Sequence, residues 1–178
     1  FFTNEIIFLD TPGKWALEGV GEDGAKHWSE LLRLLRRHRG RRPLDGVIVV
    51  VPADDLLSKS REEIYEQASH IREVIDLIHD ELKFRFPVYV IVSKADLVEG
   101  FVDFFKGLPA NRKHQVFGWS HPEPNDLSAV QSVSKAFRKV LRRMQAYRLE
   151  ILARTASASA VGRLFFFTQE FRRLESPL

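Results

Sequence analysis

Three short runs of apolar, mostly β-branched residues, separated by segments with helical periodicity, constrain the fold of this chain more than any other feature. The runs occupy residues 6–9, 47–51 and 88–92. Such runs, bounded by turn residues, are typical of strands that are covered on both faces in a parallel sheet. Alternating strands and helices require right-handed crossovers. The sequence therefore predicts a three-layer α/β fold with a mainly parallel sheet.

The helical segments surround these runs. Apolar side chains recur every three or four residues in 25–38, which Gly40 ends, and in the segment after Ser60, a predicted helix cap. Further along, the sequence predicts a short helix at 101–105, broken at Gly107 and Pro109, a long helix at about 127–156, a fourth strand at 164–167 and a tail helix from Gln169. We therefore expect one α/β domain over residues 1–168 and the start of a helical region at 169–178.

Composition limits the class of protein. The chain has 178 residues, of which 44% are hydrophobic and 29% charged, and no apolar run approaches the roughly 20 residues of a membrane span. The absence of cysteine excludes disulfides, thiolate metal ligands and cysteine nucleophiles. Because the chain opens almost directly on an apolar run, without an initiator methionine or a signal peptide, we expect it to be part of a longer polypeptide.

A first candidate site follows the opening run. Asp10, Thr11 and Gly13 form a D-x-x-G arrangement at the carboxyl end of this strand. In nucleotide hydrolases with this arrangement the carboxylate holds Mg²⁺ through water, and the glycine lets a backbone N–H approach the terminal phosphate. Asp10 is therefore the candidate metal residue, and all three are candidate nucleotide-binding residues.

A second candidate site follows the third run. Ser93, Lys94 and Asp96 match the pattern of a polar residue, lysine, any residue and aspartate that guanine-nucleotide proteins place after a strand. There the aspartate accepts two hydrogen bonds from guanine, and the aliphatic part of the lysine covers the ring. Ligands of parallel sheets bind at the carboxyl ends of the strands, so this site should share one rim with Asp10 and Pro52.

The sequence resembles the cytoplasmic GTPase-like domain of the IcmF/TssM family, the inner-membrane component of bacterial type VI secretion systems, with a counterpart in the Icm/Dot type IV system. The resemblance rests on six collinear segments: residues 8–13, 42–47, 55–57, 85–90, 93–97 together with 100–101 and 104–105, and 115–119. It implies a fold of the P-loop GTPase type and a location at the cytoplasmic face of the bacterial inner membrane. It also implies transmembrane segments outside this chain and partners among inner-membrane and baseplate proteins of the secretion system.

The chain departs from the family pattern at three points. No G-x-x-x-x-G-K-S/T phosphate loop is present, Lys14 follows Gly13 where small GTPases place a water-orienting glutamine, and Ser93 replaces the commoner asparagine. Either the sequence begins after the phosphate loop or the loop has been lost. We therefore assign no catalytic residue and expect no hydrolysis by this fragment. The nucleotide, GTP or ATP with Mg²⁺, stays open, as does the choice between a switch and a degenerate platform that only binds secretion proteins.

Two other clusters have simpler interpretations. Seven basic residues crowd positions 33–42, which favours a solvated helix end over a nucleic-acid surface, because no reading motif accompanies them. Asp54 and Asp55 follow the second run and could touch a metal or a switch loop, but such pairs more often cap a turn or a helix. The histidines show no metal-ligand spacing.

Overall fold

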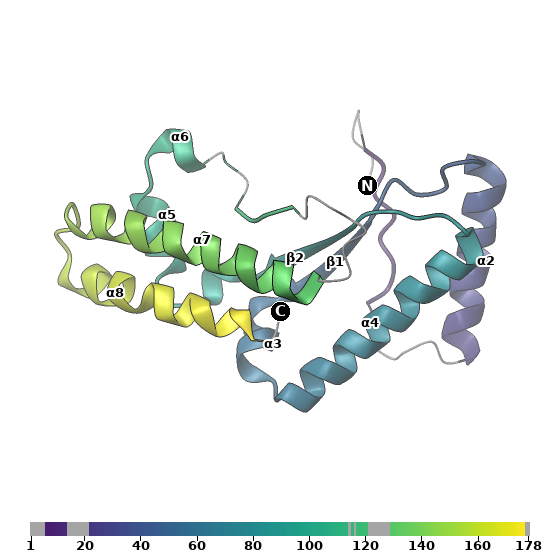
Figure 1. Cartoon of the computed structure of the whole chain (residues 1–178), viewed down its shortest axis with the longest axis horizontal. Helices are drawn as coiled ribbons and strands as arrows, with labels where there is room; N and C mark the ends of the chain where they lie inside the picture. The colour runs from purple at the N-terminus through teal and green to yellow at the C-terminus, as the bar shows by residue number, and fades with distance from the viewer. Residues whose placement is uncertain (1–5, 14–21, 114, 116, 121–128, 177–178) are drawn as a thin grey trace. The chain divides into compact units, whose positions relative to one another are not determined.

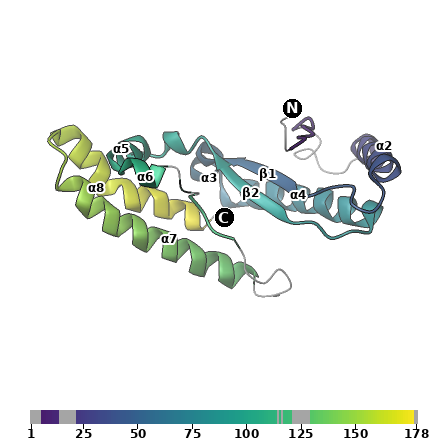
Figure 2. The same cartoon turned by 90° about the horizontal axis from the view of Figure 1, so that it is seen from above.

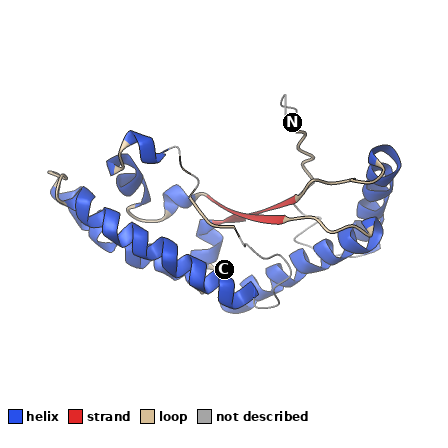
Figure 3. Cartoon of the chain, turned by 45° about the horizontal axis from the view of Figure 1, so that its top comes forward, coloured by secondary structure: helices blue, strands red, loops and turns tan. Residues whose placement is uncertain are grey.

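The computed structural model describes residues 6–13, 22–113, 115, 117–120 and 129–176. Helices dominate, and two strands form the sheet (Figures 1 and 3). In chain order the elements are α2 (Glu22–Arg39), β1 (Val47–Pro52), α3 (Ala53–Ser58), α4 (Arg61–Leu82), β2 (Val88–Ser93), the 3-10 helix η1 (Ala95–Leu97), α5 (Phe101–Gly107), α6 (Ala110–Lys113), α7 (Ala129–Leu152), α8 (Ala158–Arg172) and the 3-10 helix η2 (Arg173–Glu175). No helix among the described residues is long and apolar enough to cross a membrane.

The chain divides into two compact units. The first contains the described residues of Phe1–Val49 and Ser60–Ile91, and the second those of Val50–Lys59 and Val92–Leu178. Each unit has its own hydrophobic core. Both strands contribute residues to both units, because β1 divides after Val49 and β2 after Ile91.

The two strands confirm the second and third predicted runs. They are parallel neighbours, and α3 and α4 lie between them in sequence. The backbone N–H of Val47 donates to the carbonyl of Pro87 at 3.0 Å where the strands begin. Several of their apolar side chains are exposed, including Val50 at 57% and Val90 at 59%. A three-layer fold of the GTPase type, with a larger sheet, stays a prediction.

The opening run differs from its prediction. We expected a strand buried on both faces at 6–9, whereas Ile7 forms only an isolated β-bridge and the side chains of Ile6, Ile7, Phe8 and Leu9 are 40–58% exposed. The physical reason is that a parallel strand is buried only where neighbours cover both of its faces. The described elements do not bury these four side chains.

The first unit is built on the packing of α2 against α4 (Figure 2). Its core contains Trp28, Leu32, Val74, Ile78, Leu82 and Phe86. The predicted cap of α4 is confirmed as a full capping box: the Ser60 hydroxyl accepts from the Glu63 N–H at 3.2 Å, and the Glu63 carboxylate accepts from the Ser60 N–H at 2.8 Å. Gly40 follows α2 with φ +56°, as expected of a glycine stop.

The second unit is built on α7 and α8, which lie side by side, with α5 packed against them (Figure 1). Its buried core includes Phe104, Phe137, Met144, Leu164 and Phe167. The rings of Phe137 and Phe171 stack with centroids 5.4 Å apart. These contacts confirm the predicted helices at 101–105 and about 127–156, although α7 ends earlier, at Leu152.

The predicted fourth strand at 164–167 is wrong, because these residues lie inside α8. Ser157 caps this helix by accepting from the Ala160 N–H, and the buried side chains of Leu164, Phe167, Thr168 and Phe171 lie three or four residues apart on one face. Gly162 lies within this helix. The expected boundary at 168/169 falls within α8, and the predicted tail helix from Gln169 is its final part.

Glycines and charged residues at 14–24, and prolines with a glycine at 117–125, predict two loops, and both fall largely on residues that the structure does not describe. The loop expected at 14–24 lies outside the described residues up to residue 21, and its last three residues belong to α2. Of the loop expected at 117–125, residues 117–120 are described and contain neither helix nor strand.

Candidate functional site

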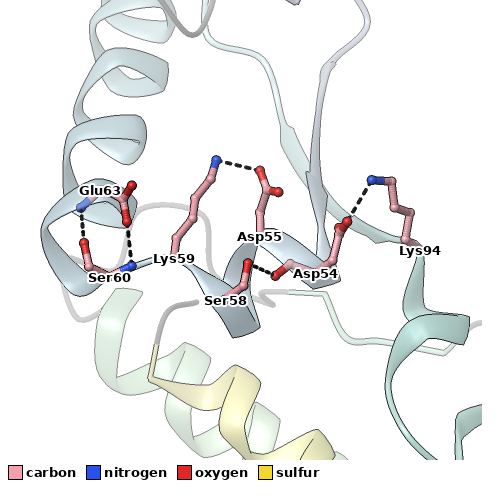
Figure 4. A network of polar contacts seen from close by, with 7 residues as sticks. All are labelled: Asp54, Asp55, Ser58, Lys59, Ser60, Glu63 and Lys94. Atoms are coloured by element: carbon pink, nitrogen blue, oxygen red, sulfur yellow. Dashed lines mark hydrogen bonds and ion pairs between the residues drawn. The ribbon is translucent and has the colours of Figure 1, made fainter.

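The second unit brings the ends of β1 and β2 together at one rim. Asp54 lies in the first turn of α3, directly after β1, and Lys94 directly follows β2. The Lys94 Nζ donates to the Asp54 Oδ2 at 2.9 Å, across 40 positions of sequence (Figure 4). This contact confirms that these two strand ends share an edge, as neighbouring parallel strands should.

Lys94 has an unusual backbone conformation. Its φ of 52° and ψ of 32° place it in the left-handed region, which side chains other than glycine rarely adopt. Lys83 is the other non-glycine residue with positive φ among the described residues, and it lies at the carboxyl cap of α4, where this conformation is common. Lys94 instead is the N-cap residue of η1, a position that ordinarily has extended backbone, so helix capping does not explain the left-handed conformation. Such outliers are frequent at functional sites.

The ion pair fixes the charges of both partners. The hydrogen bond from Lys94 holds the pKa of Asp54 below its ordinary value, and the hydrogen bond to Asp54 raises the pKa of Lys94 above its ordinary value. The Asp54 side chain is 38% exposed and the Lys94 side chain 54% exposed. The second carboxylate oxygen of Asp54, Oδ1, is buried and has no hydrogen-bond partner among the described residues.

Asp55 makes a separate, local contact. Its Oδ2 accepts from the Lys59 Nζ one helical turn away at 2.7 Å, while the Ser58 hydroxyl donates to the Asp54 backbone carbonyl at 2.7 Å (Figure 4). Pro52 precedes α3 without capping it through a side chain, and both acids favour this helix by their charge at its amino end. Asp55 therefore has a local, structural contact with Lys59, although the helix cap itself is not made by a side chain. Sequence reasoning missed the role of Asp54 as partner of Lys94.

The other two residues of the second candidate site lie in the same turn as Lys94. Ser93 ends β2 and is half-buried, and Asp96 lies in η1 with an exposed side chain. The Asp96 carboxylate makes no hydrogen bond or ion pair within the described part of the chain. It can therefore accept hydrogen bonds from a ligand, and the structure places all three predicted base-recognition residues in one turn.

The first candidate site belongs to the other unit. Asp10 and Gly13 are exposed and Thr11 is half-buried. A Cβ added to Gly13 would meet no described residue within 4 Å, so among these residues its backbone is open to approach. The described residues contain no group of three or more histidine, aspartate or glutamate side chains that could hold a metal ion. The rim shared by Asp10 with Lys94, and a metal at Asp10, stay predictions.

The basic cluster has the contacts of a solvated helix end. Four of its residues form the last turn of α2, where cations complement the helix dipole. Arg39 and Arg42 pair with Asp45 at 3.1 and 2.9 Å, and Arg36 donates to the Glu81 carbonyl at 3.2 Å. These contacts favour the simpler interpretation of the cluster.

Comparison with known proteins identifies the family. Residues 21–178 match the IcmF-related N-terminal domain. The chain belongs to this family. This IcmF-related domain is also 31% identical, over 182 residues, to "Type VI secretion system component TssM1" of Pseudomonas aeruginosa. The match covers the whole chain but only 16% of that relative. Both findings confirm the predicted IcmF/TssM resemblance. No solved structure matches this IcmF-related domain.

Proposed function

We propose that this chain is the nucleotide-binding, GTPase-like module of a type VI secretion component. It would act at the cytoplasmic face of the bacterial inner membrane, where its nucleotide state adjusts contacts with inner-membrane and baseplate proteins. The turn after β2 supports the proposal: Lys94 is strained and anchored, and the Asp96 carboxylate beside it is exposed. The similarity to a TssM1 protein supports the secretion context.

The chemistry of this turn suits the base of a nucleotide. A carboxylate with open acceptors pairs with the two adjacent N–H donors of guanine, and the aliphatic stem of a lysine packs on an aromatic ring. Asp96 and Lys94 supply these groups within three positions of sequence. Ser93 lacks the side-chain amide of the commoner asparagine and so adds nothing to guanine recognition. The proposal of GTP over ATP therefore rests on the Asp96 carboxylate alone.

Asp10, Thr11 and Gly13 would face the phosphates. A bound Mg²⁺ ion would neutralise phosphate charge there, and Asp10 is the residue that would hold it. The open backbone at Gly13 is compatible with close approach of a phosphate. Because the sequence holds no G-x-x-x-x-G-K-S/T loop, we propose that residues 1–178 alone do not hydrolyse nucleotide.

Isothermal titration of the full-length protein with GTP, GDP and ATP in the presence of Mg²⁺ tests the proposal. We expect the wild type to bind guanine nucleotides and Asp96→Asn to lose most of that binding, because its amide presents an N–H₂ where guanine needs an acceptor. Glu99→Gln is the matched control, since Glu99 is exposed and lies just beyond η1. A wild-type protein that binds none of the three nucleotides overturns the proposal.

The degenerate platform is the second candidate, and a different surface favours it. Leu149 on α7 and Phe165 and Phe166 on α8 are 64%, 52% and 53% exposed. The two phenylalanine rings meet edge to face with centroids 5.3 Å apart. Exposed large apolar side chains such as this phenylalanine pair often mark protein contacts.

A secretion assay separates the two candidates. The platform predicts that Phe165→Ser combined with Phe166→Ser abolishes secretion of a type VI substrate, whereas Asp96→Asn leaves it normal. The switch predicts loss of secretion with Asp96→Asn. Since both phenylalanines are about half exposed, the serine variant should stay folded with only a modest fall in melting temperature, which circular dichroism checks.

A further inference from the structure

We propose that Asp54 is the residue that positions Lys94 for the nucleotide base. The inference rests on the proposed nucleotide-binding function, and it assigns a role to a residue outside both candidate motifs. Asp54 would not touch the nucleotide. It would hold the Lys94 ammonium at the rim, so that the aliphatic stem of this lysine stays in place to cover the base.

The contact fixes Lys94 at both ends of its side chain. The left-handed backbone sets the direction in which the side chain leaves the turn, and the 2.9 Å hydrogen bond sets the position of Nζ (Figure 4). A free lysine side chain populates many rotamers, and ordering it on binding costs free energy. A side chain that is already ordered avoids this cost.

Asp54 is itself on a rigid support. Its neighbours Ala53 and Leu56 on α3 are 0% and 7% exposed and belong to the core of the second unit. The Ser58 hydroxyl also binds the Asp54 backbone carbonyl. The carboxylate is therefore anchored on a helix that packs into the core.

Asp55 provides an internal comparison. It is the adjacent acid on the same short helix, and its charge also helps to raise the pKa of Lys94, but its carboxylate hydrogen-bonds to Lys59 and not to Lys94. A general effect of negative charge near the rim would involve both acids alike. A positioning role requires Asp54 alone.

The test measures nucleotide affinity of the full-length protein by isothermal titration. We expect Asp54→Asn to lower the affinities for GDP and GTP by the same factor, about three- to fivefold. This is the size of effect expected for a half-exposed ion pair. Equal factors are expected because Lys94 acts on the base and not on the phosphates. Asp55→Asn, the matched control, should leave both affinities unchanged, and Asp54→Glu should recover part of the loss.

Two further measurements separate positioning from structural damage. In a Lys94→Met background, Asp54→Asn should have no further effect on affinity, because the group that it positions is gone. The NMR signal of the Lys94 ammonium should shift and exchange faster with water in Asp54→Asn. Unchanged affinity in Asp54→Asn, or an equal loss in Asp55→Asn, overturns this inference and leaves the proposed function standing. A wild type that binds no nucleotide overturns both.

Discussion

At the scale of single residues, the contacts that organise the second unit join positions far apart in sequence. Asp103 on α5 and Arg163 on α8 form a bidentate pair, with distances of 2.6 and 3.1 Å, beside Gly100. A Cβ at Gly100 would lie 2.5 Å from the Arg163 carbonyl oxygen, and the φ of +82° also disfavours other residues there. The glycine thus lets α5 approach α8 closely enough for the ion pair to form.

The Asp103 pair should make stability depend on acid pH. The hydrogen bond from Arg163 holds the pKa of Asp103 below its ordinary value of 3.8, so its stabilisation is present above that value and is lost as pH falls through the folded-state pKa. We expect Asp103→Asn to be less stable than wild type at pH 7 and the difference to shrink below about pH 3.8, as urea unfolding would measure. Asp80→Asn, at a far more exposed pair, is the control. A difference independent of pH would contradict the prediction.

Residue by residue, the sequence singled out candidates on one side of the rim and missed the contact with the other side. Ser93, Lys94 and Asp96 could be named as candidates because a lysine and an aspartate after an apolar run form a known pattern, and their role in binding stays a prediction. The partner of Lys94 could not be named, because two adjacent acids at 54 and 55 are equivalent in sequence. Only the direction in which each side chain leaves α3 separates Asp54, which reaches Lys94, from Asp55, which reaches Lys59.

At the scale of elements, periodicity and caps predicted well where both were present. The capping box and the apolar steps of α4 determined that helix, and the β-branched runs determined β1 and β2. The sequence Leu164-Phe165-Phe166-Phe167 misled because four adjacent apolar residues carry no period of their own. The burial of Leu164, Phe167, Thr168 and Phe171 shows the helical period, but only when residues after the run are included.

Alanine substitutions at two glycines test the elements on which they lie. Gly162 is inside α8, and a Cβ there would meet no described residue within 4 Å, so Gly162→Ala should stabilise the protein by about 0.5–1 kcal/mol. Gly107 ends α5, and a Cβ there would clash with the Cγ2 of the buried Ile151. Gly107→Ala should therefore destabilise the protein, and thermal unfolding of both variants gives the two signs. A loss of stability in Gly162→Ala would contradict the helical assignment of this segment.

At the scale of the whole molecule, the sequence predicts a single α/β domain for residues 1–168, whereas the structure contains two separate cores. Composition and periodicity indicate how many apolar side chains need burial, but they do not indicate how those side chains divide between cores. Trp28 and Leu32 pack with α4, whereas Phe104, Phe137 and Phe167 pack among α5, α7 and α8. The division follows from contacts between distant segments, which no local pattern contains.

Two core substitutions should reveal the division. Leu32→Ala should cost about 2–5 kcal/mol and Phe167→Ala about 3–5 kcal/mol, because both side chains are nearly inaccessible to solvent. We expect Leu32→Ala to speed amide hydrogen exchange mainly in α2 and α4, and Phe167→Ala mainly in α7 and α8. Mass spectrometry of exchanged peptides measures both. Equal acceleration throughout the chain in either variant would show that the cores unfold as one.

The way the chain divides between its units has a consequence for limited proteolysis. The chain passes from one unit to the other three times, after Val49, Lys59 and Ile91. A tryptic cut after Lys59 would give fragments 1–59 and 60–178, and each unit would then draw residues from both. Neither fragment of such a nicked protein contains a complete unit. We therefore expect the two fragments to stay associated, because each core needs residues from both.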